Sequence, residues 1–287
     1  MNINTISKVW AMIPEHLRAL TTLDTPEVSA ELKATNQARS QQRSANKVRV
    51  LPLFGTITQR PSFLSDLFGG TSTNEFTKAF DSALADETVK AVVIEIDSPG
   101  GSVSGVDELS RHIYAARGTK PILAIANSLA ASAAYWVGSA ADELHVTPSG
   151  QVGAVGVVAV HEDWSGALDK AGIKPTFITA GAHKAEGNSA EPLTDDAREE
   201  LQAQVDHAYD MFVTALARNR GATKAMVRDN YGQGRVLNAK AAVAAGMADS
   251  VATIDDVIKR AGSSHARTLT TLRGAKATLD LYKALYN

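Results

Sequence analysis

The sequence predicts an α/β fold in which strands and helices alternate around a mainly parallel sheet. Two observations carry this prediction. The apolar, β-branched run at 89–96 is typical of a strand that is buried on both faces. Strand-like runs and helical patterns then alternate along the chain, which favours parallel strands joined by right-handed crossovers. At 287 residues, the chain is long enough for one large α/β domain with extensions.

Each expected element has a local signal. The helix expected at 73–84 gathers its apolar residues on one face, and Gly172 suits the end of a helix at 163–171. Thr194 can cap a long helix at 194–219, and the two aspartates that follow it suit the positive end of the helix dipole. Further helices are expected at 103–116, 130–139, 239–245 and 254–261. Strands are expected at 48–54, 89–96, 121–126, 143–146, 155–160 and 174–179.

The chain divides into three parts by composition. Residues 1–47 form an N-terminal extension, with apolar positions at helix-like spacing before residue 25 and a polar linker after it. Pro14 either breaks that helix or starts it. Residues 48–262 form the folded α/β domain. Residues 263–287 form a polar tail, in which 279–286 could be a docking helix.

Composition excludes several classes of function. The net charge of −2 gives no strong field toward nucleic acid or an anionic membrane. Without cysteine, the chain has no disulfide, thiol nucleophile or cysteine-ligated metal. No apolar run is long enough for a membrane span, and metal, Walker and Rossmann motifs are absent. We therefore expect a soluble, cytoplasmic protein without cofactor or metal, which binds neither nucleic acid nor membrane.

Ser132 is the candidate nucleophile. It lies in the small-residue segment Asn127-Ser-Leu-Ala-Ala-Ser-Ala-Ala-Tyr-Trp136, at the start of a short helix that follows a strand. There the helix dipole and the amide of Ala133 could stabilise charge on a reacting carbonyl. The alternative is an ordinary serine of an alanine-rich helix.

A glycine turn upstream could supply further amides. In Asp97-Ser-Pro-Gly-Gly-Ser-Val103, Pro99 restricts the backbone, and two glycines permit conformations closed to other residues. Such a turn can direct the amides of Gly100 and Gly101 at an anion. The alternative is a plain strand–helix connection in which Ser102 caps the next helix.

Lys184 is the candidate general base, in the loop Ala180-Gly-Ala-His-Lys-Ala-Glu-Gly187. A lysine acts as a base only when neutral, and burial favours that form. The alternatives are an exposed loop lysine or a base role for His183, and Glu186 would oppose neutrality if it faced the lysine. The other histidines considered carry no triad or metal motif: His112, His145, His161, His207 and His265.

Several of these segments, in this order, resemble the signal peptide peptidase A (SppA) family of serine–lysine peptidases. The resemblance runs from about Val48 to Ala261 and includes the glycine turn, the segment around Ser132 and Gly153-Ala-Val-Gly-Val157. It also includes the loop that carries Lys184. The fold it implies is of the Clp/crotonase type, with stacked βαβ units that commonly form oligomers.

The resemblance implies roles for individual residues. It places the nucleophile at Ser132 and the general base at Lys184, 52 residues later, with the oxyanion hole at Gly100, Gly101 and Ala133. One position departs from the family pattern, because Ala154 stands where members often have a serine that orients the lysine. The candidate substitutes for that hydroxyl are Thr179, Ser149 and Ser189.

Within the family, the segments 9–17, 156–174 and 181–188 look like those of tailed-phage members. The resemblance therefore implies a homo-oligomeric capsid-assembly protease, acting in the host cytoplasm within the procapsid. Its expected substrates are scaffolding protein, portal or capsid proteins, and the N-terminal segment of the chain itself. Three alternatives stay open at this point: a host signal-peptide-peptidase-like protease, a catalytically impaired assembly or scaffold protein, and a crotonase-like acyl-CoA enzyme.

Overall fold

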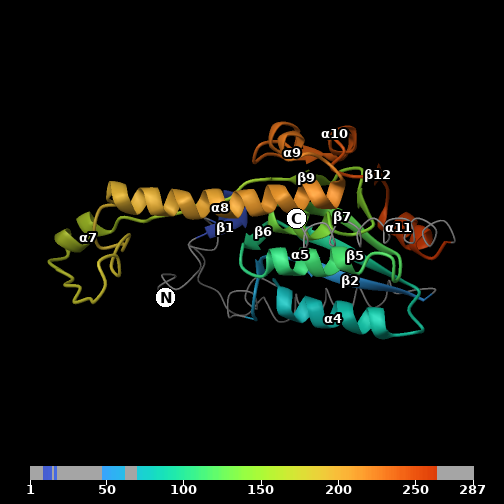
Figure 1. Cartoon of the computed structure of the whole chain (residues 1–287), viewed down its shortest axis with the longest axis horizontal. Coiled ribbons are helices and arrows are strands. Elements are labelled where there is room, and N and C mark those ends of the chain that lie inside the picture. Colours follow the sequence, from blue (N-terminus) through green and yellow to red (C-terminus); the bar gives the residue numbers. More distant parts are fainter. Residues whose placement is uncertain (1–8, 15, 18–46, 62–69, 264–287) are drawn as a thin grey trace, which may run out of the picture.

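A computed structural model of the protein describes residues 9–14, 16–17, 47–61 and 70–263. Two sheets and the helices packed on them form a body, from which one long helix carries an extended arm (Figure 1). The predicted α/β class is confirmed. Among the described residues, no helix combines the length and the apolar character needed to cross a bilayer.

The larger sheet has seven strands and is mainly parallel, as predicted. The order β11–β9–β7–β5–β2 forms its main path, with β8 pairing to β7 and β12 pairing to β8. Only the pair β11–β9 is antiparallel among its described strands. The strands are β2 (Val48–Phe54), β5 (Ala91–Ser98), β7 (Ile122–Ala131), β8 (Glu143–Val146), β9 (Gln151–Gly153), β11 (Val236–Asn238) and β12 (Ser250–Val251).

The second sheet has the strand order β10–β1–β6–β3–β4. Its second strand, β1, is antiparallel to both of its neighbours, β10 and β6. The strands are β1 (Val9–Met12), β3 (Ile57–Thr58), β4 (Thr71–Ser72), β6 (Gly100–Ser102) and β10 (Val158–Ala159). The expectation of a helical pattern through 9–12 is therefore wrong, because pairing on both edges makes this segment a strand; helical turns begin only at Pro14.

Helices cover both faces of the larger sheet. On β5, Val92, Ile94 and Ile96 pack into the main core with α4, α5, α6 and α8, whereas Ala91 and Val93 face α11. This alternation is the strand periodicity of two. The helices are α4 (Thr73–Ala85), α5 (Val106–Ala115), α6 (Ala133–Gly138), α7 (Ser165–Lys170), α8 (Asp195–Arg220), α9 (Lys224–Asn230), α10 (Ala239–Ala244) and α11 (Ile254–Ala261).

Three local expectations need correction. Residues 130–131 continue β7, so the helix expected from 130 starts at Ala133. Gly105, with a φ of 81°, precedes α5 in place of the expected cap Ser102. Residues 174–179 form no strand, since they lie exposed on the arm without a strand partner in the described chain. The tail from 264 and the linker at 26–46 lie outside the described residues.

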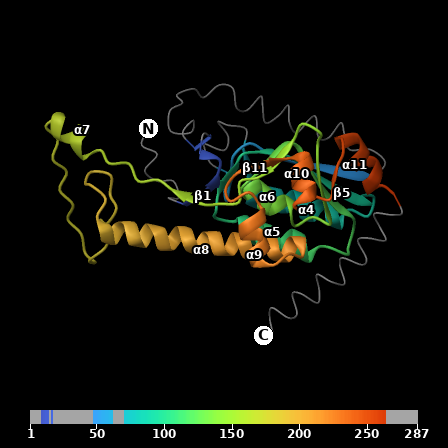
Figure 2. The ribbon, with the colours of Figure 1, turned by 90° about the horizontal axis from the view of Figure 1, so that it is seen from above.

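The arm comprises residues 160–193 and the N-terminal half of α8. Thr194 caps α8 through a 3.2 Å hydrogen bond from the Ala197 amide, as predicted. Both views place α7 and the loops around it at the far end of α8, away from the body (Figures 1 and 2). The arm therefore projects into solvent in the single chain.

The C-terminal half of α8 is anchored to the body. The rings of Trp136 on α6 and Phe212 on α8 stack, with centroids 4.5 Å apart and planes 6° from parallel. Further along α8, the side-chain amide of Asn219 donates to Ser110 Oγ at 3.1 Å and to Ser139 Oγ at 2.9 Å. These contacts join α5, α6 and α8 into one unit.

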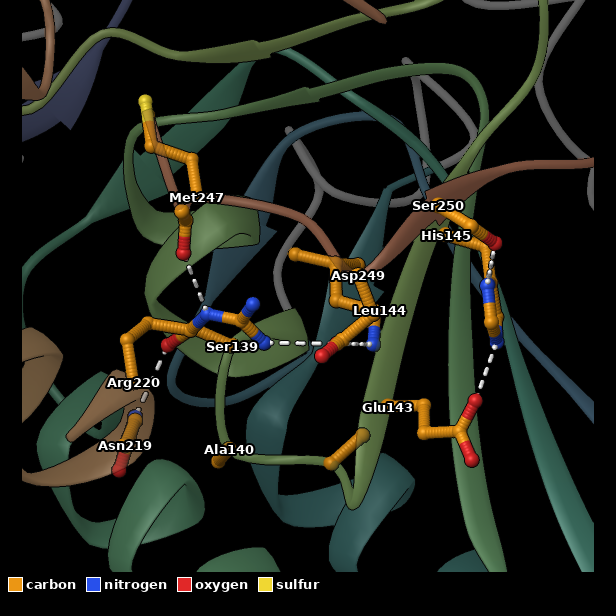
Figure 3. A network of polar contacts seen from close by, with 12 residues as sticks. Ser139, Ala140, Glu143, Leu144, His145, Asn219, Arg220, Met247, Asp249 and Ser250 are labelled. Carbon is orange, nitrogen blue, oxygen red and sulfur yellow. Dashed lines mark hydrogen bonds and ion pairs between the residues drawn. The ribbon is translucent and has the colours of Figure 1, made fainter. Parts of the chain in front are cut away.

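A polar network fastens the C-terminal elements to the sheet edge (Figure 3). Asp249 Oδ2 accepts from Arg220 Nη1 and from the Leu144 amide, both at 2.8 Å. Beside it, the buried ring of His145 contacts Ser250 Oγ at 2.9 Å and Glu143 Oε2 at 3.3 Å. The network therefore holds β12 and the end of α8 against β8.

We expect Glu143→Gln to lower the free energy of unfolding at neutral pH. Burial acts to raise the pKa of Glu143, but the hydrogen bonds and charges of His145 and Arg260 outweigh it and lower that pKa to about 2. The expected loss is about 2 kcal/mol, below that of a fully buried pair because Arg260 is partly exposed. Urea unfolding of the parent and the variant at neutral pH measures it.

The sign of the pH dependence follows from the lowered pKa. The stabilisation is present above the ordinary value of 4.5 and is lost as the pH falls toward 2, so the difference should shrink across that window. The exposed Glu87→Gln serves as control and should change little. A Glu143→Gln deficit that stays constant down to pH 3 would contradict the assignment.

Candidate active site

Ser132 occupies the turn that joins β7 to α6. Its backbone angles, φ 53° and ψ −118°, lie outside the regions that L-residues normally adopt. Its amide donates to the Gly153 carbonyl at 2.7 Å, and its Oγ donates to the Gly156 carbonyl at 3.4 Å. Strained backbone of this kind is concentrated at functional sites, where the surrounding structure holds it in place.

Ala133 follows as the first residue of α6. The first amides of a helix have no acceptor within the helix, and they carry the positive end of its dipole. The predicted amide donor therefore lies directly beside the candidate nucleophile. The role of Ala133 as a donor stays a prediction, and α6 begins three residues later than the helix expected from 130.

The structure places Gly100 against Ser132. A methyl group added to Gly100 would lie 3.1 Å from Ser132 Cβ and would clash with the Ala11 carbonyl oxygen. Its φ of 101° also disfavours any other residue. The Gly100 amide donates to Ser98 Oγ at 3.2 Å, while Gly101 lies in β6 between β1 and β3.

The segment 153–157 lies on the other side of Ser132, where its carbonyls at Gly153 and Gly156 accept from the serine. Ala154, the position that departs from the family pattern, has a φ of 51° and is 7% exposed. Its amide donates to the Arg235 carbonyl at 2.8 Å. The position that departs from the family pattern, Ala154, thus lies in the segment that contacts Ser132.

Lys184 lies on the arm and is exposed. It lines a surface depression together with Thr179 and Glu186, and the arm lies away from the body that holds α6 (Figure 2). A single chain therefore does not bring Lys184 to Ser132. Glu186 contacts the ring of His183 at 3.3 Å.

The three hydroxyls proposed to orient the lysine separate in the structure. Thr179 lines the same depression as Lys184, and Ser189 lies on the arm, where its carbonyl accepts from the Trp164 amide. Ser149 lies on the body between β8 and β9.

Among the contacts of the described residues, Ser132 Oγ binds a carbonyl and no histidine. Within those residues, no three acidic or histidine side chains are placed to hold a metal ion.

One part of the site was missed from the sequence. The strand β1 lies beside Gly100, although residues 1–47 were predicted to be an extension outside the folded domain. The Val9-Trp10 pair, with its β-propensity, was the available signal, but four residues are too few to reveal a period.

The sequence profile of Peptidase family S49 matches residues 115–267, which include both Ser132 and Lys184. The chain belongs to this family. The resemblance stated from the motifs is thereby confirmed, and the S49 assignment removes the support for a crotonase-like acyl-CoA enzyme.

Known relatives of this S49 chain include phage proteins. It is 33% identical over 248 residues to capsid assembly protease C of Escherichia phage lambda, covering 86% of this chain and 56% of the relative. It is 33% identical over 216 residues to the head-tail preconnector protein GP5 of Enterobacteria phage P21, in a match that covers 75% of this chain and 43% of that relative. The chain thus spans about half the length of these relatives.

A cellular relative matches less of the chain. Protease 4 of Salmonella typhi is 28% identical over 180 residues, covering 62% of this chain and 29% of the relative. Both identity and coverage are therefore higher for the two phage proteins.

Proposed function

We propose that this chain is a serine endopeptidase of phage or prophage head assembly, with Ser132 as its nucleophile. The observation that carries the proposal is the strained turn at Ser132, with Gly100 on one side and the start of α6 on the other. Membership of a peptidase family and the wider match to phage proteins support the same reading.

The chemistry would be acyl transfer. Ser132 Oγ attacks the carbonyl carbon of a peptide bond, and its proton passes to the base. The amides of Ala133 and Gly101 would stabilise the oxyanion, and the amide of Gly100 would join them once it is released from Ser98. Removal of one such donor typically raises the activation free energy by about 2.7–4 kcal/mol. The protonated base then gives its proton to the leaving amine, and water hydrolyses the acyl-enzyme.

For the base, we propose Lys184 from a second copy of the chain. The arm carries exposed apolar side chains at Trp164, Ile173, Phe177 and Ile178, the last of which is 95% exposed. A cluster of this kind is typical of a surface that packs against another protein. Burial of the arm in a homo-oligomer would remove Lys184 from water, which favours the neutral amine that a base requires.

The proposed substrates are proteins of the assembling head. Scaffolding protein is the first candidate, with portal and capsid proteins and the N-terminal segment of the chain itself as further ones. The similarity to capsid assembly protease C of phage lambda supports this choice of substrates. Under the proposal, the activity would lie inside the procapsid in the host cytoplasm.

Co-production of two inactive chains tests the proposal. Ser132→Ala and Lys184→Ala should each abolish cleavage of scaffolding protein when made alone. Made together, they should recover activity, because random pairing in a closed oligomer gives roughly a quarter of the sites one intact Ser132 and one intact Lys184. Gel analysis of scaffolding protein over time measures the recovery.

The double variant Ser132→Ala/Lys184→Ala, co-produced with Lys184→Ala, is the matched control and should stay inactive. Cleavage by Ser132→Ala alone would overturn the nucleophile. If mixed oligomers contain both single variants and still do not cleave scaffolding protein, Lys184 is not supplied by a second copy.

A further inference from the structure

The strand β1 fills a gap between two strands that flank the candidate nucleophile. It pairs antiparallel with β6, where Ala11 is opposite Gly101, and antiparallel with β10, where Trp10 is opposite Val158. Neighbouring strands lie about 4.8 Å apart, so β6 and β10 stand roughly two such spacings from each other. The gap therefore has the width of one extended peptide.

This gap adjoins Ser132. Its β6 side begins with Gly100, whose added methyl group would meet both Ser132 Cβ and the Ala11 carbonyl oxygen. Its β10 side follows Gly156, whose carbonyl accepts from Ser132 Oγ. The main-chain carbonyl of Ala11 and the Cβ of Ser132 thus both border the space beside Gly100.

Ser132 is inaccessible in this arrangement. Ser132 is 0% exposed, and so is Ala11 of β1. A nucleophile that acts on proteins must be reached by an extended chain, so some covering element has to leave. The strand β1 is the element that lies where that chain would bind.

The packing of β1 suits a segment that can be displaced. Trp10 and Met12 form a small cluster with Leu17 and the partly buried Val158, separate from the main core. Only Ala11 of this strand joins the main cluster. Release of β1 therefore uncovers a satellite cluster and leaves the central packing of the body in place.

We propose that β1 is an intramolecular ligand of the peptide-binding site. Residues 9–12 occupy, in antiparallel pairing, the position of an extended substrate, and they exclude other peptides until they are displaced. Main-chain hydrogen bonds along two strand edges supply affinity in such strand addition, and side-chain fit supplies specificity. The small side chain of Ala11, buried beside Gly100, indicates that the site takes peptides with a small residue at this point. The inference rests on the proposed function for the role of Ser132.

A binding experiment on the full chain tests this without any cleavage. The host chain carries Ser132→Ala, and the probe is a fluorescent peptide with the sequence of residues 7–17, Ser-Lys-Val-Trp-Ala-Met-Ile-Pro-Glu-His-Leu. Adding Ala11→Pro to the host removes an amide of β1 and breaks its pairing. We expect the host with Ala11→Pro to bind the probe at least tenfold more tightly, as measured by fluorescence anisotropy.

Two matched controls keep the result interpretable. A probe with proline in place of its alanine should not bind. A second host with Trp10→Ala, which weakens the satellite cluster without a backbone change, should also bind the normal probe more tightly. The proposal would be overturned if the parent and both altered hosts bound the probe equally, or if none of them bound it. It would also be overturned if both altered hosts melted at a lower temperature without binding the probe more tightly.

The same substitutions in a chain that keeps Ser132 separate the two proposals. Ala11→Pro should then raise kcat/KM for an added peptide. Tighter binding without any cleavage would support the role of β1 and contradict the proposed function. If Ala11→Pro changed neither the cleavage of the added peptide nor the binding of the probe, the result would support the proposed peptidase and contradict the role of β1.

Discussion

Ser132→Gly should make the chain more stable and abolish its cleavage of protein. The backbone at Ser132 has a φ of 53° and a ψ of −118°, a conformation that costs an L-residue about 1–3 kcal/mol. Glycine avoids this cost but loses about 0.5–1 kcal/mol through its freer unfolded chain. We therefore expect a net gain of about 1 kcal/mol in the free energy of unfolding.

The expected loss of activity is far larger. Removal of a serine nucleophile lowers kcat by roughly 10⁶-fold in a well-studied serine protease. Ser132→Ala is the matched variant, because it also lacks the hydroxyl but keeps the strain. Denaturant unfolding should thus rank Ser132→Gly above both the parent and Ser132→Ala, while a cleavage assay finds both variants inactive. A glycine variant less stable than the alanine variant would show that the turn is not strained.

Phe212→Ala should cost about 3–5 kcal/mol of stability, as is usual for removal of a buried aromatic ring. Phe212 is 0% exposed and stacks on Trp136, which is also 0% exposed. Removal of the ring would therefore leave a cavity between α6 and α8. Because α6 begins directly after Ser132, we also expect a loss of cleavage activity in the fraction that stays folded.

Phe177→Ala provides the control for this second prediction. Phe177 lies on the arm and is 47% exposed, so at low protein concentration its removal should change the free energy of unfolding by less than about 0.5 kcal/mol. Urea unfolding compares the two variants. Similar losses for both would mean that the stack of Trp136 and Phe212 does not anchor α8.

Both predictions concern the body, where α6 links Ser132 to the stack of Trp136 and Phe212. The body holds Ser132 through close packing of α6 and α8, and α8 carries the arm away from that packing. The helix α8 has 26 residues, and the arm that it carries includes the loop with Lys184. Under the proposed function, stability of the single chain and completion of the site are thus separate properties.

Much of the body was determined by local sequence. The strand β2 was predicted with its observed bounds, and β8 likewise, because buried strands and their turns have short-range signals. The cap at Thr194 follows from hydrogen bonding within one turn of helix. Among the residues gathered at Ser132, Gly100, Ala133 and the segment 153–157 were likewise marked by their motifs, whereas β1 was not.

Tertiary structure alone decided the rest. Residues 9–12 form a strand because they pair with segments about 90 and 150 residues further along, a contact that no local pattern encodes. Residues 174–179 have the composition of a strand but find no strand partner in the described chain, so they remain an exposed loop on the arm. Spacing along the sequence could not show that Lys184 lies on an arm away from Ser132, because local propensity sets only the conformation of each segment. Its position depends on the packing of α8 against the body, and whether a strand forms depends on which edge is free to accept it.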